Sequence, residues 1–233
     1  MKMPLFVKSA QMAFFLGSID LSDRLRVAEI IRHEMGDVLD GAPTILPIPE
    51  DAPLGIPRVI YPSKDNKFVC NVAVNRFDFI YNLPNGQTGI EIKDFRKELL
   101  TRVIKLNKLL FDELKVTSNR LGLILNYNVL PKEGGLNFLK NNYLGNPKDI
   151  AVELQFHKLT QGAIKGMNVN NWIRLVASKK QLITGENHLL VISDVNTYQK
   201  EKYNVTKEVT TSFFDDALEL SLKTVEDILS QAN

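Results

Sequence analysis

Two carboxylates and a lysine in the first half of the chain have the types and spacing of a metal-dependent hydrolytic site. Asp78 lies in an alternating apolar segment that predicts a β-strand, and Glu91 and Lys93 stand two residues apart in "GIEIK", just before a predicted helix. Two carboxylates can hold Mg²⁺ while a lysine steadies the attacking water or the scissile phosphate. The alternative is structural, because Glu91 and the following Asp94 also suit the positive N-terminus of a helix, although Lys93 does not.

This order of an acid, a hydrophobic-E-x-K segment and a helix resembles metal-dependent nucleases of the PD-(D/E)xK class. The resemblance implies a nuclease that uses Asp78, Glu91 and Lys93, with Mg²⁺ as its cofactor. Phe77 stands where the class has a proline before the acid, which is a departure from the pattern. A carboxylate separation above ~8 Å would exclude a shared ion, because oxygen ligands lie about 2.0–2.6 Å from such metals.

A second candidate site lies on the strongest predicted strand, "NRLGLILNYNVLP" at residues 119–131. Its alternation places four apolar side chains on one face: Leu121, Leu123, Leu125 and Tyr127. Arg120, Asn126 and Asn128 fall on the other face. Two amides and a guanidinium form good hydrogen bonds but make a poor nucleophile or general base. We therefore expect architecture, with Arg120 paired to a carboxylate, or a contact surface for a partner, and not catalysis.

No further catalytic or metal-binding motif occurs in the sequence. The three histidines are His33, His157 and His188, and none has a second histidine or a cysteine at zinc-ligand spacing. The patterns GxxxxGK[ST], GxGxxG and GxSxG are absent. "RHEMGD" lacks the second histidine of HExxH and is interpreted as a polar helix end.

Bulk composition does not favour a nucleic-acid or membrane partner. The 233 residues carry a formal charge of +2, whereas a dedicated nucleic-acid binder normally shows a stronger basic bias. Trp172, Phe77, Phe79 and Tyr81 could stack on bases, but aromatic residues at strand spacing are more typical of a core. No window has the roughly 18 consecutive apolar residues of a transmembrane helix. Cys70 is the only cysteine, which fits a reducing compartment, so we expect a cytoplasmic protein.

Hydrophobic periodicity predicts an α+β fold with mainly antiparallel strands and two long amphipathic helices. Strands are expected at residues 5–19, 67–82, 119–130, 150–159, 170–179 and 188–198. Helices are expected at residues 22–36, 94–115, 135–144 and 207–230. Ser22 is the expected N-cap of the first helix. The alternation changes phase near Asn75–Arg76, which predicts a β-bulge inside the second strand.

A proline-rich segment, residues 42–62, follows the first helix. Its prolines are Pro43, Pro47, Pro49, Pro53, Pro57 and Pro62. Each proline fixes φ and removes a donor, which predicts an extended surface loop with an edge strand near 57–61. The loop is either a connector between sheet edges or a functional contact surface.

The chain divides into two predicted β-rich halves, residues 1–131 and 132–233, each closed by a long helix within one continuous domain. "FVCNVAVNRF" at 68–77 and "LLVISDVNTY" at 189–198 both read as an apolar strand followed by Val-Asn-x-aromatic, which hints at a duplication. The first long helix is rich in basic residues and the second in acidic ones. Opposite charge could steer the helices together, or one copy of the chain onto another, and the alternative is two solvated faces.

The mid-chain strand "VTSNRLGLILNYNVL" resembles the hallmark of a sporadically distributed, uncharacterised bacterial protein family. Members of that family carry R-x-G-L-R-Y-x-N-R after a long helix; Arg120, Gly122 and Leu123 match, and the next two positions hold Ile-Leu instead of Arg-Tyr. "ISDVNTYQ" is similar to the family's later D-x-D-x-Y strand, with Asp194 and Tyr198 as equivalents, and "SFFDDALELSL" is similar to its closing helix. The resemblance implies a role in mobile-element or defence gene clusters, beside other proteins, and it implies no activity.

These observations together favour a non-catalytic protein-interaction or accessory subunit of a bacterial system that needs no cofactor. Its expected partner is another protein or a second copy of the chain. The candidate contact surface consists of Arg120, Asn126 and Asn128. The alternative, from a different functional class, is the Mg²⁺-dependent nuclease described above.

Overall fold

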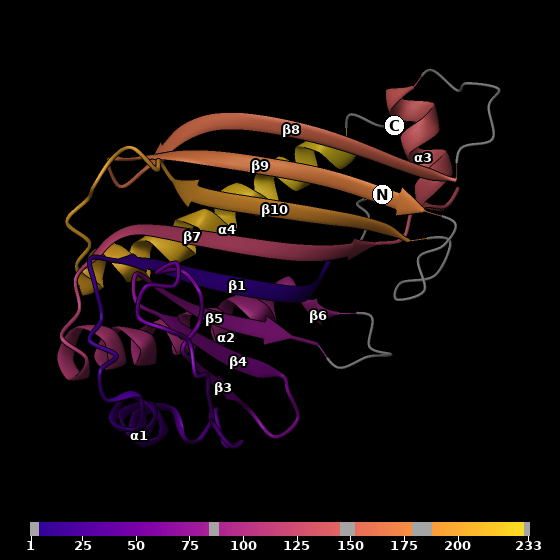
Figure 1. Ribbon diagram of the computed structural model, residues 1–233. Coiled ribbons are helices and arrows are strands. Elements are labelled where there is room, and N and C mark those ends of the chain that lie inside the picture. The colour runs from indigo at the N-terminus through magenta and orange to yellow at the C-terminus, as the bar shows by residue number, and fades with distance from the viewer. Residues whose placement is uncertain (1–4, 84–88, 145–151, 179–187, 231–233) are drawn as a thin grey trace.

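The computed structural model describes residues 5–83, 89–144, 152–178 and 188–230 (Figure 1). Over these ranges ten strands form one mainly antiparallel sheet, accompanied by four α-helices, two of them long. The expected α+β fold is confirmed. None of the helices in these ranges is long and apolar enough to cross a membrane.

The sheet is built from strands of very different length. They are β1 (Phe6–Leu16), β2 (Thr44–Ile45), β3 (Val59–Pro62), β4 (Phe68–Ala73), β5 (Arg76–Asn82), β6 (Ile90–Glu91), β7 (Ser118–Val129), β8 (Glu153–Ile164), β9 (Met167–Ser178) and β10 (Leu189–Thr197). In space they follow the order β2-β3-β4-β5-β1-β7-β10-β9-β8, and β6 pairs with β1. Because β7 pairs with both β1 and β10, strands from early and late in the chain join one sheet.

The helices begin and end close to the positions that periodicity predicts. They are α1 (Arg24–Met35), α2 (Ile92–Asn107), α3 (Gly135–Tyr143) and α4 (Lys207–Ser230), and α2 continues as a π-helix, η1 (Lys108–Glu113). The Asp23 carboxylate accepts a hydrogen bond from the Arg26 backbone amide at 2.9 Å, so Asp23 is the N-cap of α1 and the expected Ser22 is not.

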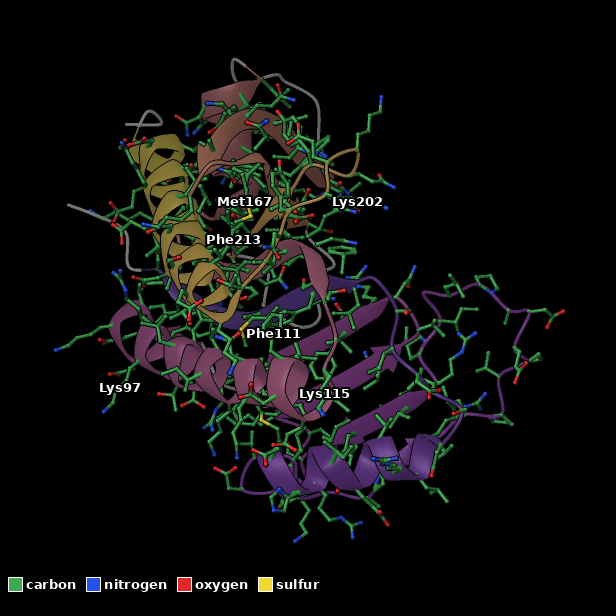
Figure 2. All side chains as sticks on the ribbon, turned by 90° about the vertical axis from the view of Figure 1, so that its left-hand side faces the viewer. Lys97, Phe111, Lys115, Met167, Lys202 and Phe213 are labelled. Atoms are coloured by element: carbon green, nitrogen blue, oxygen red, sulfur yellow. The ribbon has the colours of Figure 1, made fainter. Side chains whose placement is uncertain are left out.

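The hydrophobic core lies between the sheet and the helices on one of its faces, and Figure 2 shows α2 and α4 together on that side of the strands. The apolar face expected for β7 is fully buried there: Leu121, Leu123, Leu125 and Tyr127. Phe14 of β1 packs in the same layer, with its ring centre 6.2 Å from that of Phe77 and 5.3 Å from that of Phe214. We call this the covered face of the sheet.

The two long helices carry opposite charge and are joined by ion pairs within the chain. Arg96 of α2 contacts Asp215 and Glu219 of α4 at 2.7 and 3.0 Å, and Lys207 of α4 contacts Asp112 of η1. Exposed pairs of this kind contribute at most about 1 kcal/mol each. Some of the opposite charges on the two helices therefore neutralise each other within one chain.

The phase change near Asn75–Arg76 is a hairpin, and the expected β-bulge is wrong. β4 ends at Ala73, β5 begins at Arg76, and these two residues pair in the antiparallel register. A tight connection resets the alternation of side chains, as a bulge would. The segment expected as one strand at 67–82 is therefore two neighbouring strands.

Two arginines hold the proline-rich segment 42–62 through its backbone carbonyls. Arg58, which immediately precedes β3, is 2% exposed. The carbonyl oxygens that accept from Arg58 belong to Pro49, Ala52, Pro53 and Ile56. Arg24 of α1 donates in the same way to Leu46 and Ile48, at 2.6 and 2.9 Å. The guanidinium donors satisfy carbonyls that an extended, proline-rich backbone cannot pair with itself.

Candidate functional site

The face of the sheet opposite α2 and α4 has no helix packed on it among the described residues, as Figure 2 shows. We call it the open face. Its central side chains come from alternate positions of five strands: Arg76 and Asp78 (β5); Gln11, Ala13 and Phe15 (β1); Arg120, Gly122, Ile124, Asn126 and Asn128 (β7); Ile192, Asp194 and Asn196 (β10); Trp172 and Arg174 (β9). Strand geometry produces this face automatically, because burying every second residue turns the others outward.

The three residues of the expected metal site do not come together. Asp78 pairs with Ala13 of β1, whereas Glu91 pairs with Phe6 near the start of the same strand. From position 6 to position 13 an extended strand covers about 23 Å, at roughly 3.3 Å per residue. This separation is far beyond the reach of a shared ion, so Asp78, Glu91 and Lys93 cannot form the expected site.

Asp78 has a structural role on the open face. It accepts a hydrogen bond from the Gln11 amide nitrogen Nε2 at 2.9 Å and forms an ion pair with Arg76 at 2.9 Å, and its side chain is 12% exposed. Within the described ranges, no three His, Cys, Asp or Glu side chains gather closely enough to hold a metal ion.

Two arginines flank Phe15 near one end of the open face. In the register, Phe15 of β1 pairs with Arg76 of β5 on one side and with Arg120 of β7 on the other. The guanidinium carbons of Arg76 and Arg120 lie 4.9 and 4.2 Å from the centre of the Phe15 ring, which is cation–π distance. We call these three residues the arginine cluster.

Arg120 is a partly buried cation, and no carboxylate in the described part of the chain pairs with it. Its Nη2 donates to the Thr197 carbonyl oxygen at 3.2 Å, so the expected pairing with a carboxylate is wrong. Burial, and secondarily the neighbouring Arg76, lower the pKa of Arg120. A carboxylate partner would raise that pKa, so the direction of the shift agrees with the geometry.

The two asparagines of the expected contact surface lie farther along β7 and are tied to neighbours. Asn126 Nδ2 donates to the Ser9 hydroxyl at 2.6 Å, and Asn128 Oδ1 lies 2.7 Å from His188 Nδ1. Asn128 is only 3% exposed, whereas Asn126 is half-buried. Arg120 and Asn126 therefore retain accessible surface on the open face, and Asn128 has almost none.

Trp172 and Arg174 are exposed side chains of the open face. Trp172 is 42% exposed, and Arg174 is exposed without a hydrogen-bond or ion-pair partner among the described residues. Together with Ile124, Ile192 and Asp194 they line a shallow depression of about 290 Å³. The depression joins an aromatic ring and two aliphatic side chains to a carboxylate and an unpaired guanidinium.

The aromatic residues considered as a stacking platform divide between the two faces. Phe77, Phe79 and Tyr81 are at most 5% exposed and belong to the core, whereas Trp172 stands on the open face. The sequence "NNWIRLVAS" carries the signal for this difference, because Trp172 and Arg174 alternate with residues apolar enough to be the buried set. That alternation, and not the residue type, is the signal in the sequence that places Arg174 beside Trp172.

Comparisons with known proteins were made with both the sequence and the structure. No protein-family model matches the sequence, and no curated protein matches it either. Among solved structures, the chain is similar to the rolling circle replication initiator protein from Geobacillus stearothermophilus, with 11% identity and a TM-score of 0.34, over 91% of this chain and 79% of that one.

This comparison corrects the leading functional expectation. The similar structure belongs to a replication initiator, so the expected non-catalytic protein-interaction or accessory subunit is contradicted. A TM-score of 0.34 supports no further argument about fold or activity. The proposed function therefore rests on the side chains of the open face.

Proposed function

We propose that the open face binds single-stranded nucleic acid. The observation that carries the proposal is Trp172, which is 42% exposed on a sheet face that no described helix covers. It lies beside Arg174, which has no hydrogen-bond or ion-pair partner in the described part of the chain. Every base offers a π-face, so an exposed ring on a sheet can stack on a base whatever the sequence. One such stack contributes about 1–3 kcal/mol to binding.

Other groups on the open face suit the same ligand. Guanidinium planes stack on bases and pair with phosphate, and the arginine cluster supplies two of them. The amides of Gln11, Asn126 and Asn196 lie on the same face, on the strands β1, β7 and β10. Amide groups can hydrogen-bond to base edges. Stacking, phosphate pairing and edge recognition are thus offered on one surface.

Charge is distributed more favourably than the total of +2 indicates. The centre of the open face presents Arg76, Arg120 and Arg174, against the carboxylates of Asp78 and Asp194, and Glu91 and Glu153 lie at its margins. Asp78 is already paired with Arg76. Six acidic residues lie on α4, behind the sheet. The centre of the open face therefore carries more positive than negative groups, which suits a polyanion there.

A single strand fits this surface better than a duplex. In a duplex the faces of the bases are hidden by stacking, so Trp172 could not reach them without unpairing. The open face also lacks a described helix that could enter a major groove. We expect binding to depend little on sequence, because stacking and phosphate pairing dominate it.

The resemblance of the mid-chain strand to the sporadic bacterial family remains part of the proposal, as does a cytoplasmic location. A reducing compartment suits a chain whose only cysteine, Cys70, is fully buried. Burial raises the pKa of the Cys70 thiol, which keeps it protonated and unreactive.

Fluorescence anisotropy of a labelled oligothymidylate tests the proposed function. Trp172→Ala should weaken binding about tenfold or more, as expected from the loss of one stack. Arg174→Ala should weaken it several-fold. Two matched controls on α1 should leave it unchanged: Leu25→Ala, at a side chain 67% exposed, and Arg26→Ala.

The choice of nucleic acid supplies a second comparison. A duplex of the same length should bind more weakly than the single strand at the same salt concentration. Equal affinity of the wild type and Trp172→Ala for the single strand, or no binding by the wild type, would refute the proposed function.

A further inference from the structure

We infer that the arginine cluster, Phe15 with Arg76 and Arg120, is a phosphate-binding subsite of the open face. The inference rests on the proposed function, because its ligand there is a phosphate group of the bound single strand. A free phosphate ion offers the same chemistry, and the experiments below separate the two sources. Three features of the cluster support the inference: unused donors, unbalanced charge and guanidinium groups that Phe15 already holds in place.

The two guanidinium groups keep donors that no described residue uses. A guanidinium carries five N–H bonds in a fixed plane. Arg120 directs Nε and Nη2 to the Thr197 carbonyl oxygen, which leaves Nη1. Arg76 directs Nε to Asp78, which leaves both terminal nitrogens. A phosphate has several acceptor oxygens and can receive from both residues at once.

The positive charge of the cluster exceeds the negative charge beside it. The carboxylate paired with the cluster is Asp78, which contacts Arg76 and also accepts from Gln11. Arg120 itself has only a carbonyl oxygen as its acceptor. Like charges on either side of one ring repel each other, and a bound anion would relieve that repulsion. The lowered pKa of Arg120, caused by burial and then by Arg76, is consistent with the missing counter-charge.

Phe15 holds both cations in place before any ligand arrives. The ring attracts each guanidinium to its π-system, at 4.9 Å for Arg76 and 4.2 Å for Arg120. Side chains that are already fixed lose less conformational entropy when they bind. The outward edge of an aromatic ring is also its positive part, so it does not repel an anion.

The side chains of the cluster keep accessible surface of their own. The Arg76 side chain is 32% exposed, and Phe15 and Arg120 are half-buried, whereas the neighbouring Ala13 and Gly122 are buried. A phosphate could therefore reach the guanidinium groups from the solvent side of the sheet.

The cluster and Trp172 are far enough apart to engage different nucleotides. Trp172 is in register with Asp194, Ile124 and Gln11 across three strand spacings, and Phe15 lies four residues beyond Gln11. Strand spacings of about 4.8 Å and rises of about 3.3 Å per residue put the two roughly 20 Å apart. A strand would therefore cross the open face diagonally, with a base stacked at Trp172 and a phosphate held at the cluster.

The salt dependence of oligothymidylate binding tests the subsite. For single strands the slope of log K against log salt changes by about 0.7 for each phosphate contact. Arg120→Gln and Arg76→Gln should each reduce the slope by about 0.7 and weaken binding several-fold. Trp172→Ala should weaken binding and keep the slope, because stacking releases no counterion. Arg26→Gln on α1 should change neither quantity.

Two further measurements keep the result interpretable. Circular dichroism and thermal melts verify that each variant is folded. If Arg120→Gln does not fold, Arg76→Gln provides the test of the subsite in its place. Thermal melts with inorganic phosphate, against chloride at the same ionic strength, show whether the cluster takes a free ion. A phosphate-dependent rise in the melting temperature should occur in the wild type and disappear in Arg120→Gln.

The outcomes separate the subsite from the proposed function. If the wild type binds oligothymidylate and both arginine variants keep its full salt slope, the subsite is refuted and the proposed function stands. If the wild type does not bind oligothymidylate, the proposed function fails. The thermal melts with inorganic phosphate then decide whether the arginine cluster binds a free phosphate ion. A rise that requires Arg120 then supports a site for free phosphate, and an equal rise in both proteins, or none, overturns the subsite.

Discussion

The covered and open faces of one sheet differ most plainly at two neighbouring residues of β1. Phe14 is fully buried on the covered face, where its ring contacts Phe77 and Phe214. Phe15, the next residue, turns to the open face and lies between two guanidinium groups. The same residue type is therefore core at one position and a support for charged side chains at the next.

This difference shows how one sheet separates stability from recognition. Burial of apolar area stabilises the fold, and it is concentrated where α2 and α4 cover the strands. The open face buries less, yet it keeps Trp172 exposed and leaves Arg174 unpaired among the described residues. Groups that contribute little to folding and form a common surface are best explained by a ligand.

Alanine substitutions at Phe14 and Phe15 give the largest expected contrast. Phe14→Ala removes a packed core ring and should lower the free energy of unfolding by about 3–5 kcal/mol. Phe15→Ala removes two cation–π contacts and should cost about 1–2 kcal/mol. Chemical denaturation measures both, and equal losses would contradict the division between the faces.

Two arginines extend the comparison to charged side chains. Arg58 is buried and its guanidinium donates to four backbone carbonyls, so Arg58→Met should cost about 2–3 kcal/mol by leaving acceptors unpaired. Arg174→Met should change stability by less than about 0.5 kcal/mol, because Arg174 is exposed on the surface. A loss at Arg174 as large as that at Arg58 would show that it serves the fold.

The smallest expected effect is a pH dependence at the edge of the open face. Burial, and secondarily Lys8, lower the pKa of His188 below its usual 6.5 in the folded protein. The unfolded chain then binds the proton more tightly, so stability present above pH 6.5 is lost as the pH falls through the folded-state pKa. Between pH 7.5 and 5, wild type should lose more stability than His188→Gln in denaturation experiments, and parallel losses would argue against this role.

Local patterns predicted much of the architecture. The alternation in residues 119–131 placed the buried leucines correctly, and the steps of three and four in residues 94–115 and 207–230 gave the long helices. The same alternation in "NNWIRLVAS" is sufficient to place Trp172 and Arg174 together on one face. Periodicity succeeds in these cases because each pattern reports a face of a single element.

The arrangement between strands could not be predicted in this way. Phe15, Arg76 and Arg120 meet only because β1 lies between β5 and β7, and no local pattern encodes that order. The opposite error occurred at Asp78 and Glu91, which are close in sequence but pair with distant positions of β1. Register between strands is set by contacts across the whole sheet, so the short sequence spacing of Asp78 and Glu91 does not bring them together.

Intrinsic fluorescence of the wild-type protein tests the central claim most directly. Trp172 is the only tryptophan in the chain, so its emission reports on the open face alone. A single-stranded oligothymidylate that stacks on Trp172 should quench this emission and saturate at the same concentration as the anisotropy signal. Binding that leaves the emission unchanged, or no binding at all, would contradict the account.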